Sequence, residues 1–359
     1  MQRNRIIIER NVPVLMRDGV HLRADIYRPD NDERYPVILC RLPYNKEDPL
    51  LHLEGVLPFR ALDAGFAIVY QDTRGRFQSD GDFYPFIYEG QDGYDTVEWV
   101  ANQPWCTGAV GMTGASYFGA TQWLTAIQQP PHLKAICPVV TASEYYQGWT
   151  YQGGAFQLGF ILFWTLTGLA PDTAQRLAED KNVGLEEMTR LLEQGDRIGE
   201  HYRHLPLNNL PVLSNTEAAG YYDDWLAHYE KDEYWQALAV NRQYGRINVP
   251  AFNIGGWYDL FLPGTLENFT RMCDEGGSEV AREKQQLLIG PWAHGNFSGS
   301  YPESNFGFYG SWEGAAVVDQ KVEFFKRYVM EEDDQTQEIS PVRLFVMGIN
   351  RWRDVVEWA

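Results

Sequence analysis

The apolar positions of this 359-residue chain form short, nearly continuous runs that alternate with longer segments of helical spacing. The strand-like runs cover residues 35–44, 65–72, 109–114, 133–141, 249–258 and 285–293. Helical spacing of apolar residues occurs at 56–64, 89–103 and 115–129. A nearly continuous apolar run is typical of a strand covered by helices on both faces of a parallel sheet. The alternation therefore predicts an α/β fold with a mostly parallel central sheet.

Two regions depart from this alternation. Residues 6–29 alternate apolar and polar positions around Asp18 and Gly19, which predicts a β-hairpin. Residues 145–240 contain no convincing strand and have mostly helical spacing, which predicts a helical cap inserted over the sheet. We therefore expect the α/β domain to consist of two parts, residues 1–144 and 241–335.

Glycines surround a serine at the point where a strand-like run meets a helical segment. The sequence from Gly111 to Gly119 reads GMTGASYFG, which places Ser116 in a sharp turn between a strand and a helix. Such a turn lifts the hydroxyl above the sheet, beside helix N–H groups that can stabilise an oxyanion. The G-x-S-x-G pattern has glycine two residues after the serine, whereas Phe118 occupies that position here. The local pattern thus fits a nucleophile and an ordinary glycine-rich turn about equally.

A nucleophilic serine requires a histidine base and a carboxylate that orients the histidine. In the chain order of α/β-hydrolases the serine comes first, then the acid, then the histidine. Asp259 and His294 each follow a late strand-like run, so they are the candidate acid and base. The other histidines lie on earlier elements or in the predicted cap: His21, His52, His132, His201, His204 and His228. Glu267 and Asp274 lie within a helical segment and are weaker candidates for the acid. Capping of that helix is the alternative role of Asp259.

An oxyanion hole needs two hydrogen-bond donors close to the nucleophile. The backbone N–H of Tyr117, the residue after Ser116, is one expected donor. The second should come from the loop at 41–44, which contains no glycine, so the phenol of Tyr44 is a candidate. Packing as a half-buried aromatic at the strand end is the alternative role of Tyr44.

Several segments together resemble the cocaine esterase-like (CocE/NonD) hydrolases, which are grouped with the Xaa-Pro dipeptidyl-peptidase (S15) family and the α-amino-acid ester hydrolases. They follow the family's order along essentially the whole chain: MRDGVHLRADIYRP, PYNK, QDTRGRFQSDGDF, GMTGASYFG, GGWYD, GPWAH and PVRLFVMGINRWRD. The resemblance implies that Ser116 of G-x-S-Y-x-G is the nucleophile, Asp259 the acid and His294 the base. It also implies that the phenol of Tyr44 and the N–H of Tyr117 form the oxyanion hole.

The resemblance further implies an α/β-hydrolase fold with a helical cap and a C-terminal jelly-roll domain. The acidic run from Glu331 to Asp334 is the expected linker, and the β-rich residues 336–359 resemble only the start of that third domain. We therefore expect the jelly-roll domain to be largely absent from this chain. An uncovered sheet-packing surface would favour association between copies, so a homo-oligomer is possible.

Charge and cysteine content narrow the possible functions. The net charge is −19 and no run of Lys and Arg occurs, so neither nucleic acid nor a membrane surface is an expected partner. The four cysteines are scattered without metal-ligand spacing, and no segment has the length of a membrane span. The N-terminal segment lacks the apolar stretch of a secretory signal, which predicts a cytoplasmic protein.

These features predict a serine hydrolase that cleaves an ester or amide bond of a small molecule through an acyl-enzyme, with no metal or organic cofactor. Phe118 stands beside Ser116 where an acid could have bound an amino group, and Trp149 belongs to the aromatic-rich cap. We expect both side chains to contact an apolar or aromatic acyl ester. Release of Xaa-Pro dipeptides is the alternative activity. A truncated, inactive remnant that binds a partner is the alternative of another class.

Overall fold

The computed structural model describes residues 5–53, 56–213, 216–331, 340–356 and 358. Within them one central sheet has the strand order β1-β2-β4-β3-β5-β6-β9-β10-β13-β14. The strands are β1 (Ile6–Leu15), β2 (His21–Pro29), β3 (Tyr35–Leu42), β4 (Ala67–Asp72), β5 (Cys106–Ala115), β6 (Leu133–Val139), β9 (Phe252–Tyr258), β10 (Gln286–Ala293), β13 (Val342–Val346) and β14 (Arg351–Val355). Neighbours from β4 to β13 are parallel. The predicted α/β fold with a mostly parallel sheet is thus confirmed.

The predicted N-terminal hairpin forms one edge of this sheet. β1 pairs antiparallel with β2, from Ile6 opposite Pro29 to Leu15 opposite His21. Gly19 in the turn has φ +91°, a left-handed conformation that glycine adopts without a Cβ clash. β2 also pairs antiparallel with β4, which joins the hairpin to the parallel strands.

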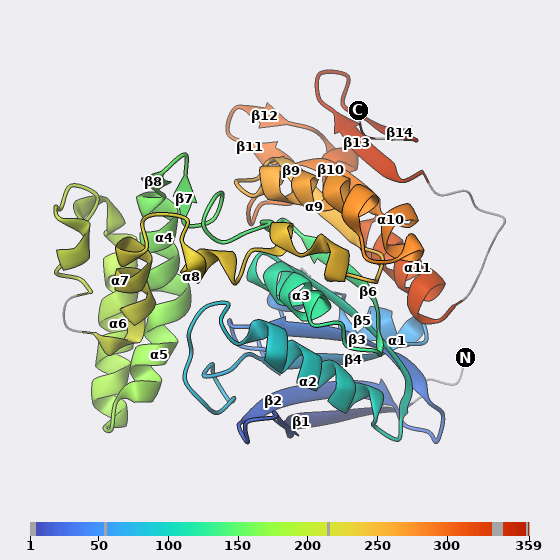
Figure 1. Ribbon diagram of the computed structural model, residues 1–359, viewed down its shortest axis with the longest axis horizontal. Helices are drawn as coiled ribbons and strands as arrows, with labels where there is room; N and C mark the ends of the chain where they lie inside the picture. The colour runs from blue at the N-terminus through green and yellow to red at the C-terminus, as the bar shows by residue number, and fades with distance from the viewer. Residues whose placement is uncertain (1–4, 54–55, 214–215, 332–339, 357, 359) are drawn as a thin grey trace.

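Helices cover both faces of the sheet and come from the segments between strands. They are α1 (Pro58–Asp63), α2 (Glu89–Ala101), α3 (Tyr117–Ile127), α9 (Leu262–Glu275), α10 (Glu279–Glu283) and α11 (Val317–Val329). Figure 1 shows α2, α3 and α9 in front of the sheet. A Cβ on Gly111 of β5 would lie 2.8 Å from the ring of Phe325 in α11, while one on Gly114 would meet Phe118 of α3. Because side chains alternate along a strand, α3 and α11 lie on opposite faces.

The predicted helical cap is inserted between β6 and β9, and Figure 1 shows its helices gathered beside the sheet, at the left. Its elements are β7 (Tyr151–Gln152), β8 (Ala155–Phe156), α4 (Leu158–Trp164), a π-helical turn (Thr165–Leu169), α5 (Ala170–Leu177), α6 (Lys181–Asp196), α7 (Gly220–Ala227) and α8 (Glu233–Gln236). The short β7–β8 hairpin has no clear sequence signal. Two of these helices, α7 and α8, are separated because Asp232 caps α8 by accepting from the N–H of Tyr234.

The C-terminal strands differ from the expectation that residues 336–359 begin a separate β domain. β13 pairs in parallel with β10, and β14 returns antiparallel to β13. Both strands therefore extend the central sheet. Residues 332–339, which contain most of the expected acidic linker, lie outside the described residues. The β-rich sequence pattern identified the strands, but only the pairing with β10 shows which sheet they join.

Aromatic side chains fill the interface between the cap and the sheet. Phe86 stacks on Tyr145 with ring centroids 4.0 Å apart, and Trp164 stacks on Trp225 at 6.0 Å. Trp149 contacts Trp164 edge to face at 5.5 Å, so these rings form one continuous cluster. Rings of this size bury large apolar surfaces and pack in defined orientations. The cluster therefore holds the cap in a fixed position over the carboxyl ends of the strands.

Candidate active site

Ser116 lies in a strained turn between β5, which ends at Ala115, and α3, which begins at Tyr117. Its φ is +56° and its ψ is −119°, a conformation that costs a non-glycine residue about 1–3 kcal/mol. Backbone hydrogen bonds hold it there: its N–H donates to the carbonyl of Val139 at 2.8 Å. Its own carbonyl accepts from the N–H of Gly119 at 2.9 Å. The hydroxyl is thereby fixed above the sheet at the start of a helix.

Two glycines make this turn sterically possible. Gly114 has φ +144°, and a Cβ there would lie 2.4 Å from Cβ of Phe118. A Cβ on Gly119 would lie 2.7 Å from Cβ of Thr141, in the segment after β6. The glycine at the third position after Ser116 therefore lets α3 approach the sheet closely. This contact gives a physical reason for the glycine spacing that departs from G-x-S-x-G.

His294 and Asp259 meet Ser116 above the carboxyl ends of β10, β9 and β5, in a sheet where β6 lies between β5 and β9. Nε2 of His294 lies 3.0 Å from Oγ of Ser116, and Nδ1 lies 2.8 Å from Oδ1 of Asp259. Because an ionised carboxylate only accepts hydrogen bonds, we place the proton of a neutral imidazole on Nδ1. Nε2 is then the acceptor for the hydroxyl hydrogen of Ser116.

The surroundings of Asp259 fix its orientation. Its side chain is fully buried, whereas that of His294 is 26% exposed. Oδ2 of Asp259 accepts from the N–H of Phe261 at 3.2 Å, just before α9 begins. Asp259 therefore holds the helix start with one oxygen and the imidazole with the other, which combines the two roles considered from sequence. The ring of Phe261 also contacts the imidazole edge to face, with centroids 5.0 Å apart.

Tyr44 and Tyr117, the two expected oxyanion donors, lie next to each other. Their ring centroids are 6.5 Å apart, and the ring of Tyr44 also contacts Phe118 at 5.6 Å. The hydroxyl of Tyr44 accepts a hydrogen bond from Nε1 of Trp164 at 2.7 Å, so its own hydrogen is directed away from Trp164. Tyr117 is the first residue of α3, and N–H groups in a first helical turn have no acceptor within the helix.

A buried ion pair beneath the nucleophile was not identified from sequence. Glu89 of α2 lies 3.0 Å from Nη1 of Arg41, and both side chains are almost fully buried. The hydroxyl of Tyr117 donates to Glu89 at 3.0 Å and accepts from the N–H of Phe86 at 2.8 Å. Burial raises the pKa of Glu89, and the nearby Arg41 opposes that shift. The network fixes the side chain of the residue that follows Ser116, but its members are distant in sequence and carry no shared motif.

The two expected substrate contacts occupy interior positions. Phe118 is 1% exposed and packs between Tyr44 and Gly114, while Trp149 is fully buried. Trp149 stacks on Phe261 with ring centroids 4.3 Å apart. In this arrangement neither side chain contacts a substrate directly, and each acts by packing against residues nearer the surface. Their aromatic character indicated packing against the site, but sequence alone does not distinguish a surface ring from one behind it.

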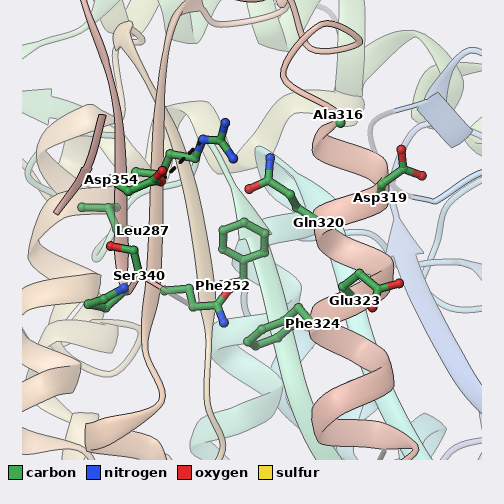
Figure 2. A pocket seen from close by; sticks show the side chains of 12 residues that line it. Phe252, Leu287, Ala316, Asp319, Gln320, Glu323, Phe324, Ser340 and Asp354 are labelled. Atoms are coloured by element: carbon green, nitrogen blue, oxygen red, sulfur yellow. Dashed lines mark ion pairs between the residues drawn. The ribbon is translucent and has the colours of Figure 1, made fainter. Parts of the chain in front are cut away.

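A cavity of about 490 Å³ lies away from Ser116, between α11 and the sheet (Figure 2). Phe252 and Gln286, which begin β9 and β10, line it together with Ser340 just before β13. It therefore opens at the amino ends of these strands, whereas Asp259 and His294 follow their carboxyl ends. Reactive groups of parallel α/β sheets lie at the carboxyl ends, so this cavity is not part of the candidate active site.

The described residues contain neither a cluster of His, Cys, Asp and Glu suited to hold a metal ion nor a helix long and apolar enough to cross a membrane.

Ser116 lies in a strained strand-to-helix turn and is hydrogen-bonded to a histidine that contacts a buried carboxylate, which is the arrangement of groups found in serine hydrolases of the α/β-hydrolase type. The model of the X-Pro dipeptidyl-peptidase (S15) family matches residues 18–296, so the chain belongs to this family. It is 34% identical over 353 residues to the cocaine esterase of Rhodococcus sp. (strain MB1 Bresler), covering 97% of this chain and 59% of that protein. A putative Xaa-Pro dipeptidyl-peptidase of Bacillus cereus is 23% identical over 323 residues, covering 75% of this chain and 54% of that one.

Solved structures show the same fold. An aminopeptidase from a marine sediment Thaumarchaeota archaeon aligns with a TM-score of 0.73 and 22% identity, covering 98% of this chain and 59% of that one. A CocE/NonD family hydrolase from Staphylococcus aureus aligns with a TM-score of 0.69 and 22% identity, covering 98% of this chain and 56% of that one. The chain thus spans 54% to 59% of the length of the relatives named here.

Proposed function

We propose that the protein is a serine hydrolase that cleaves an ester or amide bond through an acyl-enzyme. The observation that carries this proposal is the continuous hydrogen-bonded series from Asp259 through His294 to Ser116, with distances of 2.8 Å and 3.0 Å. These distances are short enough for the imidazole to take the hydroxyl proton directly as a general base. The family relationship agrees with this chemistry.

The reaction has two acyl-transfer steps. In the first, Oγ of Ser116 attacks the carbonyl carbon while Nε2 of His294 takes the hydroxyl proton. The tetrahedral intermediate collapses when the imidazolium returns this proton to the leaving oxygen or nitrogen, which leaves the acyl group on Ser116. In the second, His294 activates a water molecule in the same way, and the acid is released. Asp259 keeps the imidazole oriented and stabilises its positive charge in both steps.

The negative charge of each tetrahedral intermediate must be stabilised by positioned donors. We assign this role to the hydroxyl of Tyr44 and the backbone N–H of Tyr117. The contact between their rings and the helix start at Tyr117 support this assignment. Their contribution is made in the transition state, because the carbonyl oxygen gains its charge only there.

The charge environment favours an ester with an apolar acyl group over a peptide with a free amino terminus. Recognition of an ammonium group requires an available carboxylate. Glu89 is paired with Arg41, and Glu144, the first acid after β6, is paired with Lys231 of the cap. Aromatic side chains lie near the serine and histidine: the interior Phe261 contacts His294, and the half-buried Tyr44 contacts Phe118, two residues after Ser116. Release of Xaa-Pro dipeptides remains the second candidate, since relatives with that printed name match the chain.

Substitution of the nucleophile tests the proposal. Ser116→Ala should abolish hydrolysis of p-nitrophenyl acetate and labelling by a fluorophosphonate probe, because both reactions require an activated serine. Ser143→Ala is the matched control, since Ser143 also follows a sheet strand but donates to Glu267. The control should keep both signals, and mass spectrometry of the labelled wild type should locate the adduct on Ser116. Undiminished turnover by Ser116→Ala would refute the assignment of Ser116 as the nucleophile. Comparing kcat/KM for p-nitrophenyl acetate and for a proline-linked chromogenic dipeptide would rank esters against Xaa-Pro peptides as substrates.

A further inference from the structure

Arg76 is a fully buried guanidinium at the junction of the cap and the sheet domain. It lies in the loop after β4, and its Nη1 donates to the carbonyl of Leu169 at 2.6 Å and to Oγ1 of Thr173 at 2.8 Å. Its Nη2 donates to the carbonyl of Gly168 at 3.0 Å. These three acceptors all belong to the cap. One side chain of the sheet domain therefore anchors the end of the π-helical turn and the start of α5.

The cap presents unusual backbone at this point. The π-helical turn (Thr165–Leu169) and Pro171, which has no N–H, interrupt the regular helical hydrogen bonding between α4 and α5. The carbonyls of Gly168 and Leu169, at the end of this turn, both accept from Arg76. The planar fork of an arginine matches several acceptors in fixed directions, whereas a lysine ammonium provides one point charge. The contact is therefore specific for the orientation of the cap.

The same guanidinium also holds the loop that carries Tyr44. Nε of Arg76 donates to the carbonyl of Pro43 at 2.7 Å, and Pro43 directly precedes Tyr44. The hydroxyl of Tyr44 in turn accepts from Nε1 of Trp164 in α4. Arg76 fixes the backbone of the Tyr44 loop and Trp164 fixes its hydroxyl, and both contacts run to the same part of the cap.

The loop that carries Arg76 is itself fixed to the sheet. The N–H of Thr73 donates to the carbonyl of Leu42 at 3.0 Å, and Oγ of Ser79 donates to the carbonyl of Asp72 at 2.7 Å. These two hydrogen bonds tie the loop to the sheet domain, and cap residues contact the same loop: the N–H of Phe77 donates to Asp172 of α5 at 3.2 Å. The guanidinium of Arg76 therefore stands between a loop held by the sheet and the backbone of the cap.

The charge of Arg76 is balanced mainly by carbonyl dipoles. The nearest carboxylate oxygen described, on Asp172, lies 3.7 Å from Nη1. The rings of Phe83 and Phe77 lie 4.7 Å and 5.2 Å from the guanidinium carbon. Burial lowers the pKa of Arg76, and the fields of Asp172 and nearby tyrosines, Tyr44 among them, oppose that shift. A buried positive charge close to the Tyr44 phenol also favours negative charge on a substrate oxygen beside it.

We propose that Arg76 is a positioning residue that couples docking of the cap to placement of the Tyr44 hydroxyl in the oxyanion hole. This inference rests on the proposed function, since it assumes that Tyr44 stabilises the oxyanion. It predicts that Arg76 acts on kcat through Tyr44 and has little effect on KM, because the oxyanion contact is made only in the transition state.

A double-mutant cycle between Arg76→Met and Tyr44→Phe tests this coupling. Loss of one oxyanion donor should lower kcat for p-nitrophenyl acetate by about 100-fold in Tyr44→Phe. A displacement of the Tyr44 hydroxyl by about 1 Å has an effect of similar size, so Arg76→Met should lower kcat by up to about 100-fold. In the Tyr44→Phe background, Arg76→Met should lower kcat by less than about threefold more, because the hydroxyl that it positions is already absent.

Arg176 provides a matched control from the same interface. It belongs to α5 of the cap and donates to the carbonyls of Phe77 and Ser79 in the loop after β4, but its hydrogen bonds do not include Pro43. Arg176→Met removes hydrogen bonds between the cap and this loop but leaves the contacts of Pro43 and Tyr44 in place, so kcat should stay within about twofold of the wild type. Equal losses of kcat in Arg176→Met and Arg76→Met would overturn the inference. So would losses from Arg76→Met and Tyr44→Phe that simply multiply in the double variant. Either result would show that Arg76 supports the fold in general and does not act through Tyr44.

Two milder variants keep the test valid if Arg76→Met does not fold. Arg76→Lys retains the charge without the fork, and Thr173→Val removes one acceptor of Nη1. Both should lower kcat less than Arg76→Met does, and both effects should vanish in the Tyr44→Phe background. If Tyr44→Phe itself has wild-type kcat, the oxyanion assignment fails and this inference fails with it. Failure of Ser116→Ala to abolish turnover is a separate result, which refutes the proposed nucleophile.

Discussion

Replacing Asp259 by asparagine changes one hydrogen bond of the candidate active site from acceptor to donor. Oδ1 of Asp259 faces Nδ1 of His294 at 2.8 Å, and Oδ2 accepts from the N–H of Phe261 at 3.2 Å. An asparagine whose carbonyl keeps the Phe261 contact must turn its NH2 group toward Nδ1. Because that group donates, Nδ1 must accept, and the imidazole proton moves to Nε2. A protonated Nε2 cannot take the proton of Ser116.

The expected loss follows from this change of tautomer. In a serine triad, the same exchange of the orienting carboxylate lowers kcat by about 10,000-fold, and a similar loss is expected here at neutral pH. At 1.36 kcal/mol for each factor of ten, this corresponds to about 5.4 kcal/mol of transition-state stabilisation. The fold should be retained, because asparagine has the shape of aspartate and still accepts from Phe261.

The assay compares kcat for p-nitrophenyl acetate and the rate of fluorophosphonate labelling between the wild type and Asp259→Asn. Glu267→Gln is the control, because Glu267 lies on the adjacent helix α9 and pairs with Arg271. The control should retain both rates within a few-fold. A loss of less than tenfold in Asp259→Asn, or a comparable loss in Glu267→Gln, would refute the role of Asp259 in orienting His294.

Two further substitutions test the support beneath the nucleophile. Glu89→Gln leaves a buried guanidinium without its carboxylate and should lower the free energy of unfolding in urea by about 3–5 kcal/mol. The control Glu187→Gln, which breaks a surface ion pair, should change this free energy little. Similar losses in both variants would contradict a stabilising role of the buried pair. Gly114→Ala places a Cβ at a φ of +144° and 2.4 Å from Cβ of Phe118. It should therefore lower the free energy of unfolding more than Gly148→Ala, whose Cβ meets open space at a φ of +88° and should cost about 1–2 kcal/mol. Equal losses at the two glycines, measured in the same urea titration, would show that the turn relaxes around the added methyl group.

Much of the catalytic arrangement could be predicted because α/β chemistry follows chain order. The carboxyl ends of parallel strands meet at one edge of the sheet, so residues that follow separate strands become neighbours. Ser116, Asp259 and His294 each follow a strand-like run, and the structure brings them within hydrogen-bond distance. The roles of these residues remain a proposal, but their proximity follows from the sequence pattern and the topology it predicts.

The supporting contacts could not be predicted in the same way. Arg76 and Arg41 read as ordinary charged loop and strand residues, yet both are fully buried. Their partners lie in α2, in the cap and in the Tyr44 loop, and no periodicity links them. Phe118 and Trp149 have the composition of substrate contacts, but the structure places them behind other rings. Which elements pack together decides whether a charged side chain finds a partner in the interior. It also decides whether an aromatic side chain is covered by other residues.

The sequence by itself determined the alternation of strands and helices, the helical insertion and the turn at Ser116, because these depend on local periodicity and on glycine positions. The tertiary structure alone decided that β13 joins β10, that Glu89 supports Tyr117, and that Arg76 joins the cap to the Tyr44 loop. The physical reason is that buried hydrogen bonds and ion pairs are set by the proximity of groups that are distant along the chain. Local pattern places a residue on its element, and packing between elements then selects its partners.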